Sequence, residues 1–266
     1  MFRYHPRFFV LCALFACCVF GLPATADVKM VTQMETSGTA ATNGESVVYI
    51  KGLKMRTEQE VSGRQMVSIL DLESQQMINL NMKKKRAEVF DMSGVGEQVE
   101  QFVDASTVSV SLEPTGATQN IAGAVCNVHD MMVKVEVEIA PGSGMGATMV
   151  MDGTACLVPD APGAEDYQRF YAAMAEKGLF LGDPRAAQGP GAGQQKGMTE
   201  LYRKMAEKGV AYHSDMNVGF DGSGMMAKML GNLSFDSKTT VKSVSTDPLS
   251  DSLFVVPSGW KVKNVN

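Results

Sequence analysis

Apolar and polar residues alternate along most of the chain, as they do in strands that bury one face of a sheet. The alternation predicts strands at 28–34, 46–60 with an interruption at Gly52, 65–72, 76–82 and 86–90. The dipeptides Asn43-Gly44, Ser62-Gly63 and Glu73-Ser74 are predicted as turns. Because these connections are short, we expect an antiparallel meander with one apolar and one polar face.

The strand pattern continues after a short helix predicted at 95–103. Further strands are expected at 108–112, 118–121, 125–139, 147–158, 212–220, 227–235 and 239–245, with a short apolar strand and a turn at 253–260. The turn residues Pro141–Gly144 fold 125–139 back onto 147–158 as a long hairpin.

Residues 164–209 change to helical periodicity and contain an internal repeat. The sequence FYAAMAEKG at 170–178 recurs as LYRKMAEKG at 201–209. Each copy ends in Lys-Gly before an apolar residue, which is typical of a glycine C′ cap. We predict two amphipathic helices in an insert at about 160–209, joined by a Pro/Gly/Gln-rich loop at 183–197.

The first 26 residues have the order of a secretory signal peptide. Arg3 and Arg7 precede an apolar run at 8–20, and Ala24-Thr25-Ala26 forms a small-residue cleavage site. The run is too short to cross a membrane as a helix. We therefore predict cleavage after Ala26, a periplasmic location and one β-rich domain at 27–266.

A lipoprotein is the alternative, because Leu14–Cys17 loosely resembles a lipobox. Processing at Cys17 is disfavoured, since the apolar residues Cys18-Val19-Phe20 would then begin the chain.

Charge restricts the class of partner. The chain has 24 basic and 29 acidic residues and loses two arginines with the leader. Nucleic-acid-binding proteins usually present a basic face, so no nucleic-acid partner is expected. No second apolar run reaches spanning length, so no transmembrane segment is expected after cleavage. The basic run Lys83–Arg86 is interpreted as a solvated hairpin tip, with contact to anionic lipid headgroups as the alternative.

Removal of the leader would leave two cysteines, Cys126 and Cys156. Two cysteines in an exported chain suggest one disulfide. Folding the predicted hairpin about its turn brings them almost opposite each other, so we predict a structural disulfide; two separate buried thiols are the alternative.

Catalytic motifs are missing from the sequence. G-x-S-x-G, H-E-x-x-H, C-x-x-C and the Walker pattern do not occur. His129 and His213, the histidines outside the leader, have no identifiable partner and are expected to be structural. We predict no enzyme activity, no catalytic residue, no metal site and no cofactor.

Methionine is abundant, with 20 residues of which only Met1 lies in the leader. Most occupy apolar positions of predicted strands and helices, so core packing is the commonest explanation. An adaptable surface lining a ligand is the second, and Cu(I) binding through thioethers is the third.

Four segments resemble an exported family known as domain of unknown function 4412. YIKGLKMR at 49–56 is similar to its opening strand and the segment 69–80 to its next hairpin. TGATQNIAG at 115–123, before Cys126, and FVVPSGW at 254–260 are similar to its later motifs. The resemblance covers most of the chain after the predicted leader, and it is weakest over the helical insert.

The resemblance implies an α+β fold like that of the lipoprotein carriers LolA and LolB. In that fold a curved antiparallel sheet forms an incomplete β-barrel, and helices cover the concave side. It also implies a cavity for acyl chains or related apolar ligands, and it transfers no catalytic residue.

We therefore expect a periplasmic binding or carrier protein for an apolar, lipid-like ligand, with the two repeated helices as its lid. The residues expected to face the ligand are Met30, Met34, Met55, Met149, Met151, Phe170, Tyr171, Met174, Leu201 and Met205. An envelope structural or protein-interaction module with a packed core is the first alternative, and methionine-based copper binding the second.

Overall fold

The computed structural model describes residues 27–38, 42–61, 63–102, 107–138, 146–182, 184–187, 191–221 and 234–265. The predicted leader, the turn at 141–144 and most of the predicted strand at 227–235 fall outside these ranges.

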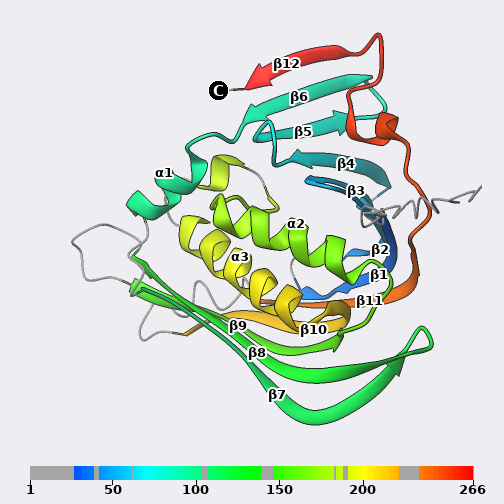
Figure 1. The fold of residues 1–266 in the computed structure, drawn as a ribbon. Coiled ribbons are helices and arrows are strands. Elements are labelled where there is room, and N and C mark those ends of the chain that lie inside the picture. Colours follow the sequence, from blue (N-terminus) through cyan, green and yellow to red (C-terminus); the bar gives the residue numbers. More distant parts are fainter. Residues whose placement is uncertain are drawn as a thin grey trace, which may run out of the picture.

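One curved sheet makes up most of the described chain. Its strands are β1 (Val28–Thr36), β2 (Thr42–Lys51), β3 (Lys54–Val61), β4 (Arg64–Asp71), β5 (Gln76–Asn81), β6 (Arg86–Asp91), β7 (Val108–Ile121), β8 (Ala124–Glu138), β9 (Gly146–Val158), β10 (Val210–Asp221), β11 (Phe235–Ser245) and β12 (Lys261–Val265). Their order is β12-β6-β5-β4-β3-β2-β1-β11-β10-β9-β8-β7, so β12 and β7 are its two edges. Figure 1 shows the sheet curving from β12 to β7 without closing.

Neighbouring strands are antiparallel except for β12, which runs parallel to β6. The predicted all-antiparallel sheet is therefore a mixed one. The parallel pair arises because the C-terminal segment crosses the sheet before it adds β12 at the edge, instead of returning through a tight hairpin.

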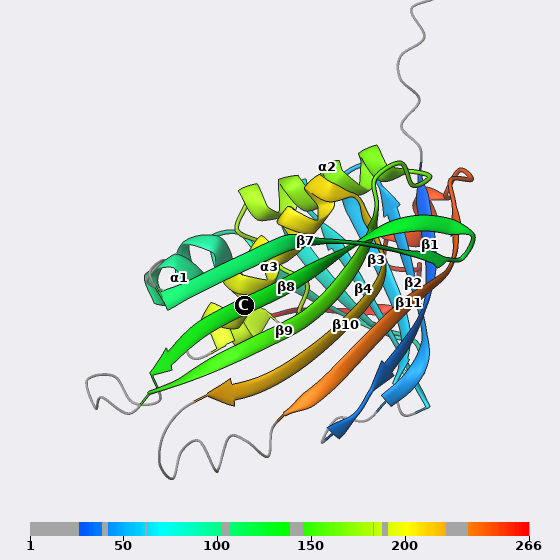
Figure 2. The same ribbon diagram turned by 90° about the horizontal axis from the view of Figure 1, so that it is seen from below.

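The helices occupy the concave side of the sheet (Figures 1 and 2). They are α1 (Val95–Phe102), α2 (Ala164–Glu176), α3 (Gly191–Lys208) and the short 3₁₀ helix η3 (Pro184–Ala187). A second 3₁₀ helix, η4 (Asp251–Phe254), lies in the C-terminal segment on the other face of the sheet. The predicted fold, α+β with a curved, incompletely closed sheet and helices on its concave side, is confirmed at this level.

Several segments differ from their predictions. The loop predicted at 183–197 contains η3 and the start of α3, and the strands predicted at 108–112 and 118–121 are the single strand β7. Asn43 and Gly44 are not a turn but part of β2, where a Cβ on Gly44 would lie 2.8 Å from the Glu60 carbonyl oxygen. The interruption at Gly52 is a complete turn between β2 and β3, with a φ of 56°. The strand predicted within 253–260 is instead η4 and a turn, because the Ser250 side chain accepts from the Ser252 N–H and caps the 3₁₀ helix.

The two copies of the repeat end differently. At the end of α2 the Gly178 N–H donates to Ala175 O and the Leu179 N–H to Met174 O, both at 2.9 Å, which is the predicted glycine cap. After α3, Gly209 leads directly into β10, and a Cβ there would lie 2.5 Å from the Val158 carbonyl oxygen. The second glycine therefore permits close approach to β9 rather than a left-handed cap.

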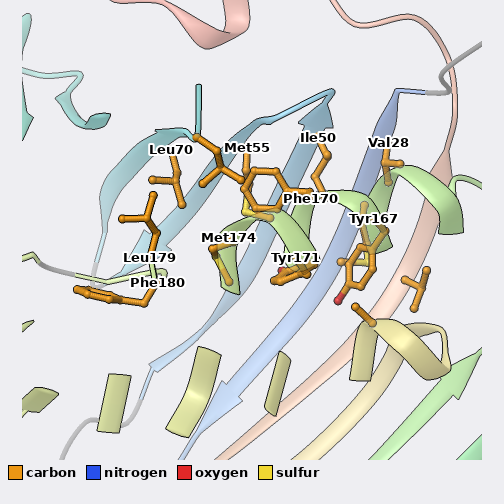
Figure 3. Close-up of a cluster of buried hydrophobic side chains, with 14 of the residues drawn as sticks. Val28, Ile50, Met55, Leu70, Tyr167, Phe170, Tyr171, Met174, Leu179 and Phe180 are labelled. Atoms are coloured by element: carbon orange, nitrogen blue, oxygen red, sulfur yellow. The ribbon is translucent and has the colours of Figure 1, made fainter. Parts of the chain in front are cut away.

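Buried side chains form three clusters. The first joins α2 to the concave face of the sheet, with Phe170 and Met174 fully buried against strands that include Ile50 and Met55 (Figure 3). The second joins α3 to β8, β9 and β10. The third lies on the opposite face of β4, β5 and β6, where Phe254 covers it. The sheet is thus covered on both faces along part of its length.

Candidate functional site

Cys126 and Cys156 form a disulfide between β8 and β9, with their Cα atoms 5.2 Å apart. The strand register places Val128 opposite Cys156, so Cys126 lies diagonally across the hairpin by two residues. Both cysteines are buried in the first cluster. The predicted hairpin and pairing are confirmed, and the buried bond is a structural link.

The ten residues expected to face a ligand lie mostly in the packed interior. Met30, Met55, Phe170, Tyr171 and Met174 belong to the first cluster, and Met149, Met151, Leu201 and Met205 belong to the second. Met34 is half-buried, with its sulfur 3.9 Å from the Gln59 side-chain nitrogen. Whether a ligand displaces any of these contacts stays a prediction.

Three tyrosines connect the two long helices. The Tyr171 ring lies 4.6 Å from that of Tyr167 and 5.6 Å from that of Tyr202, centroid to centroid. Tyr171 and Tyr167 hydrogen-bond to each other through their side chains, and Tyr167 also bonds to the Ala211 backbone. Burial raises the pKa of both Tyr167 and Tyr171 above its usual value, so both stay neutral. These contacts fix α2 and α3 to each other.

A cleft of about 370 Å³ opens between the helices and the free edge strand β7. Its lining residues are Gly96, Val99 and Glu100 from α1, Val108 and Val110 from β7, Ala175 from α2 with Gly178 and Phe180 after it, and Gln195, Lys196, Thr199, Glu200 and Lys204 from α3. This volume falls within the usual range for a small-molecule site.

The cleft has apolar walls. Val99 and Phe180 are buried, and Val108 and Val110 are half-buried. Thr199 is the buried polar side chain among them, and its hydroxyl donates to the Leu179 carbonyl oxygen at 3.2 Å. Most of the remaining side chains of the lining are polar or charged, so a ligand in the cleft would meet hydrocarbon and polar groups together.

Charged residues surround the entrance. Arg203 donates to both carboxylate oxygens of Glu200, at 2.6 and 2.9 Å, and these bonds hold the pKa of Glu200 below its usual value. Lys204 lies farther from the same carboxylate, at 3.9 Å. Arg203 also pairs with Glu207, so Arg203 and Lys204 together face the two carboxylates of Glu200 and Glu207, and these charges largely compensate one another.

Close glycine contacts shape the cleft. A Cβ on Gly96 would lie 2.8 Å from the Lys177 carbonyl oxygen, so α1 packs directly on the end of α2. A Cβ on Gly197 would lie 2.5 Å from a methyl carbon of Val133, so α3 packs directly on β8. The cleft is the space left between α1 and α3 where β7 ends the sheet.

None of the ten predicted ligand-facing residues lines this cleft. Its apolar walls come from predicted elements, since Val108 and Val110 alternate in a predicted strand and Val99 lies in a predicted helix. No pattern in the sequence indicates that α1 turns back to face α3. Because the cleft depends on this tertiary arrangement, it could not be predicted from the sequence.

The two histidines of the described residues each lie within hydrogen-bond distance of another group of the protein. His129 donates from Nδ1 to the Asn127 carbonyl oxygen at 3.0 Å, and His213 Nδ1 lies 2.8 Å from the Thr240 hydroxyl. Within the described residues no three His, Cys, Asp or Glu side chains converge as metal ligands. Methionines gather in the second cluster, which contains Met131, Met149, Met151 and Met205, with Met198 and Met216 packed against it.

Among the helices of the described ranges, none is long and apolar enough to cross a membrane.

Comparisons with known proteins add little to these observations. No model of a known protein family matches the chain, and no curated protein matches it. A crystal structure of an uncharacterized conserved protein from Thermus thermophilus is similar at 8% sequence identity and a TM-score of 0.40, over 91% of this chain and 92% of that one. A TM-score of this size is too low to establish a shared fold.

Proposed function

We propose that this protein is an exported, non-catalytic binding or carrier protein of the bacterial envelope, and that its ligand is apolar or lipid-like. The observation behind the proposal is the apolar-walled cleft between α1, α3 and β7. The cleft lies at the open side of an incompletely closed sheet, where a ligand can enter from solvent. The LolA-like and domain of unknown function 4412 affiliations belong to the same proposal, since they rest on the sequence resemblance.

The packed interior changes the role that we assign to the helices. Tyr167, Tyr171 and Tyr202 connect α2 to α3, and fully buried side chains join both helices to the sheet. Moving the pair as a lid would expose this core. We therefore place the ligand beside α3, in the cleft, and expect α2 and α3 to remain in place when it binds.

Export after cleavage at Ala26 is compatible with the start of the sheet. The Asp27 carboxylate accepts from the Leu249 N–H at 2.6 Å, and β1 follows at Val28. Cleavage before Asp27 would therefore leave β1 and its anchoring to the C-terminal segment intact.

Native mass spectrometry of the protein purified from the periplasm tests both parts of the proposal. The spectrum is expected to contain a chain that begins at Asp27, together with a bound species that organic extraction removes and identifies as a lipid or another apolar molecule. A homogeneous ligand-free mass that takes up neither fatty acid nor phospholipid would reject the carrier function. A lipid-modified chain that begins near Cys17 would reject the predicted processing.

An envelope interaction module with a packed core is the second candidate. Nine of the ten residues predicted to face a ligand are instead buried in packed clusters, and this favours it. Such a module has no saturable site for an apolar dye, whereas a carrier has one.

Methionine-based copper binding remains a third proposal. The methionines of the second cluster are where thioether ligands would have to converge. A competition assay with a Cu(I) chelator tests it, and failure of the protein to withdraw Cu(I) would remove it.

A further inference from the structure

Basic residues gather where the β5–β6 turn meets the start of β12. Lys83, Lys84 and Lys85 lie in the turn, and Arg86 begins β6. Because β12 pairs with β6 in parallel, Lys261 lies beside Arg86, and the Lys261 N–H donates to the Lys85 carbonyl oxygen at 3.1 Å. Figure 1 shows this turn next to the start of β12. The run of four in the sequence is thus a surface of five cations, which we name the basic patch.

The basic patch is not neutralised by neighbouring acids. All five side chains are exposed, and none of them forms an ion pair with another described residue. The chain as a whole is acidic, with a formal charge of −5. A concentrated positive surface on an acidic protein attracts anions selectively to one place.

Apolar side chains border the basic patch. Val262, directly after Lys261, is 55% exposed. Trp260, directly before Lys261, is partly exposed. Tryptophan is enriched at membrane–water interfaces, where one part of the ring meets hydrocarbon and another meets water.

We propose that the basic patch docks the protein on a membrane surface that bears anionic lipid headgroups. Clusters of four or more Lys and Arg residues near a membrane attract such lipids. The lysines occupy a turn and a strand edge and have no fixed ion-pair partners among the described residues. Such an arrangement can contact lipid headgroups, which move freely in the membrane plane, more readily than an acidic peptide whose charges have fixed spacing. The proposal stands whether or not the cleft binds an apolar ligand.

Co-sedimentation of the purified protein with phosphatidylcholine vesicles, with and without phosphatidylglycerol, tests the docking. Binding is expected only with phosphatidylglycerol and should weaken as salt increases, because exposed charges are screened. Each lost cation should weaken binding about fivefold. The triple variant Lys83→Gln, Lys84→Gln, Lys85→Gln is therefore expected to bind about a hundredfold more weakly.

The matched control changes three exposed lysines elsewhere, Lys134→Gln, Lys177→Gln and Lys208→Gln. It has the same net charge as the patch variant, so a nonspecific charge effect would weaken both variants equally. The control is expected to retain wild-type affinity to within about twofold, since screening limits the reach of distant charges. Equal weakening of the two variants would overturn the assignment to the patch.

Trp260 reports where the membrane touches the protein, because it is the sole tryptophan of the chain. Phosphatidylglycerol vesicles with a nitroxide-labelled headgroup are expected to quench its fluorescence in the wild type and in the control, but not in the patch variant. Absence of vesicle binding at low salt would overturn the proposal. So would binding to soluble polyglutamate without binding to vesicles, which would identify an acidic protein as the partner.

Discussion

Glycine positions determine how closely α3 approaches the sheet. Gly197→Ala is expected to lower the free energy of unfolding by about 1–3 kcal/mol, as overpacking does in cores. The added Cβ would meet Val133, which is fully buried and β-branched and therefore cannot turn away. Alanine would otherwise favour the helix, so a loss of stability identifies the contact as the cause.

Urea unfolding measures this effect, and Gly219→Ala is the control. The nearest heavy atom to a Cβ on Gly219 is Asn217 Oδ1, at an ordinary 3.7 Å. The control should change stability by no more than about 0.5 kcal/mol. A Gly197→Ala protein as stable as the wild type would mean that α3 does not pack as closely as described.

The free energy of unfolding is expected to depend on pH through His213. Burial lowers the pKa of His213 below its usual value, Lys238 lowers it further and Asp215 opposes them. The unfolded state therefore binds a proton more readily than the folded state. The resulting stabilisation is complete above the unfolded pKa of about 6.5 and is lost as pH falls from there toward the folded pKa.

Thermal unfolding between pH 7 and pH 5 checks this dependence. The wild-type midpoint should fall across this interval, and the midpoint of His213→Gln should fall less. Both proteins should lose stability near pH 4, since hydrogen bonds from Ser37 and Asn217 lower the pKa of Asp236 and depend on its ionised form. Parallel profiles for the two proteins between pH 7 and pH 5 would contradict the role of His213.

At the scale of elements, the C-terminal segment holds down the outer face of the sheet. Arg56 Nη1 donates to the Leu253 carbonyl oxygen at 2.9 Å, and Lys51 Nζ donates to the Leu249 carbonyl oxygen at 2.7 Å. Phe254 is 4% exposed within the third cluster. Phe254→Ala is expected to lower the free energy of unfolding by about 3–5 kcal/mol, because it leaves a cavity under the segment.

Val255→Ala is the matched control in the same segment. Val255 is 49% exposed, so its truncation should change stability by no more than about 0.5 kcal/mol. Guanidinium unfolding of both variants makes the comparison, and similar stabilities for the two would show that the segment does not cover a core.

The disulfide links β8 and β9 across a sequence separation of 30 residues. Closing a loop of this length stabilises the folded state by about 3–4 kcal/mol in the chain-entropy treatment. The double variant Cys126→Ala, Cys156→Ala should lose about that much stability in urea unfolding. A reducing agent should destabilise the wild type similarly and leave the variant unchanged; a variant as stable as the oxidised wild type would refute the role of the bond.

Most elements were predictable because their side chains alternate or repeat locally. The strands at 65–72, 76–82 and 86–90 agree with β4, β5 and β6 to within a residue or so. The start of α3 was not predictable, since Gly191, Gly193 and Gly197 disfavour a helix and only packing on β8 compensates for them. The parallel pairing of β12 likewise depends on a crossing that no local pattern encodes.

At the scale of the whole molecule, the sheet, its edges and its helices leave an apolar-walled cleft beside β7. The ten residues predicted to face a ligand were chosen because they are apolar and regularly spaced, and the same properties place a residue in a packed core. The walls of the cleft depend on how α1 and α3 face each other, which is a tertiary contact. Periodicity could therefore predict the sheet and the helices but not the site between them.

The central claim is that this cleft binds an apolar ligand, and a dye titration with two tryptophan variants tests it most directly. Val110→Trp places an indole in the cleft, whereas Ser111→Trp places one on the exposed opposite face of the same strand. Titration with N-phenyl-1-naphthylamine should show one saturable site in the wild type and in Ser111→Trp, and at least about tenfold weaker binding in Val110→Trp, as expected when steric overlap removes about 1.4 kcal/mol or more. No saturable site in the wild type, or equal binding by Val110→Trp, would contradict the account.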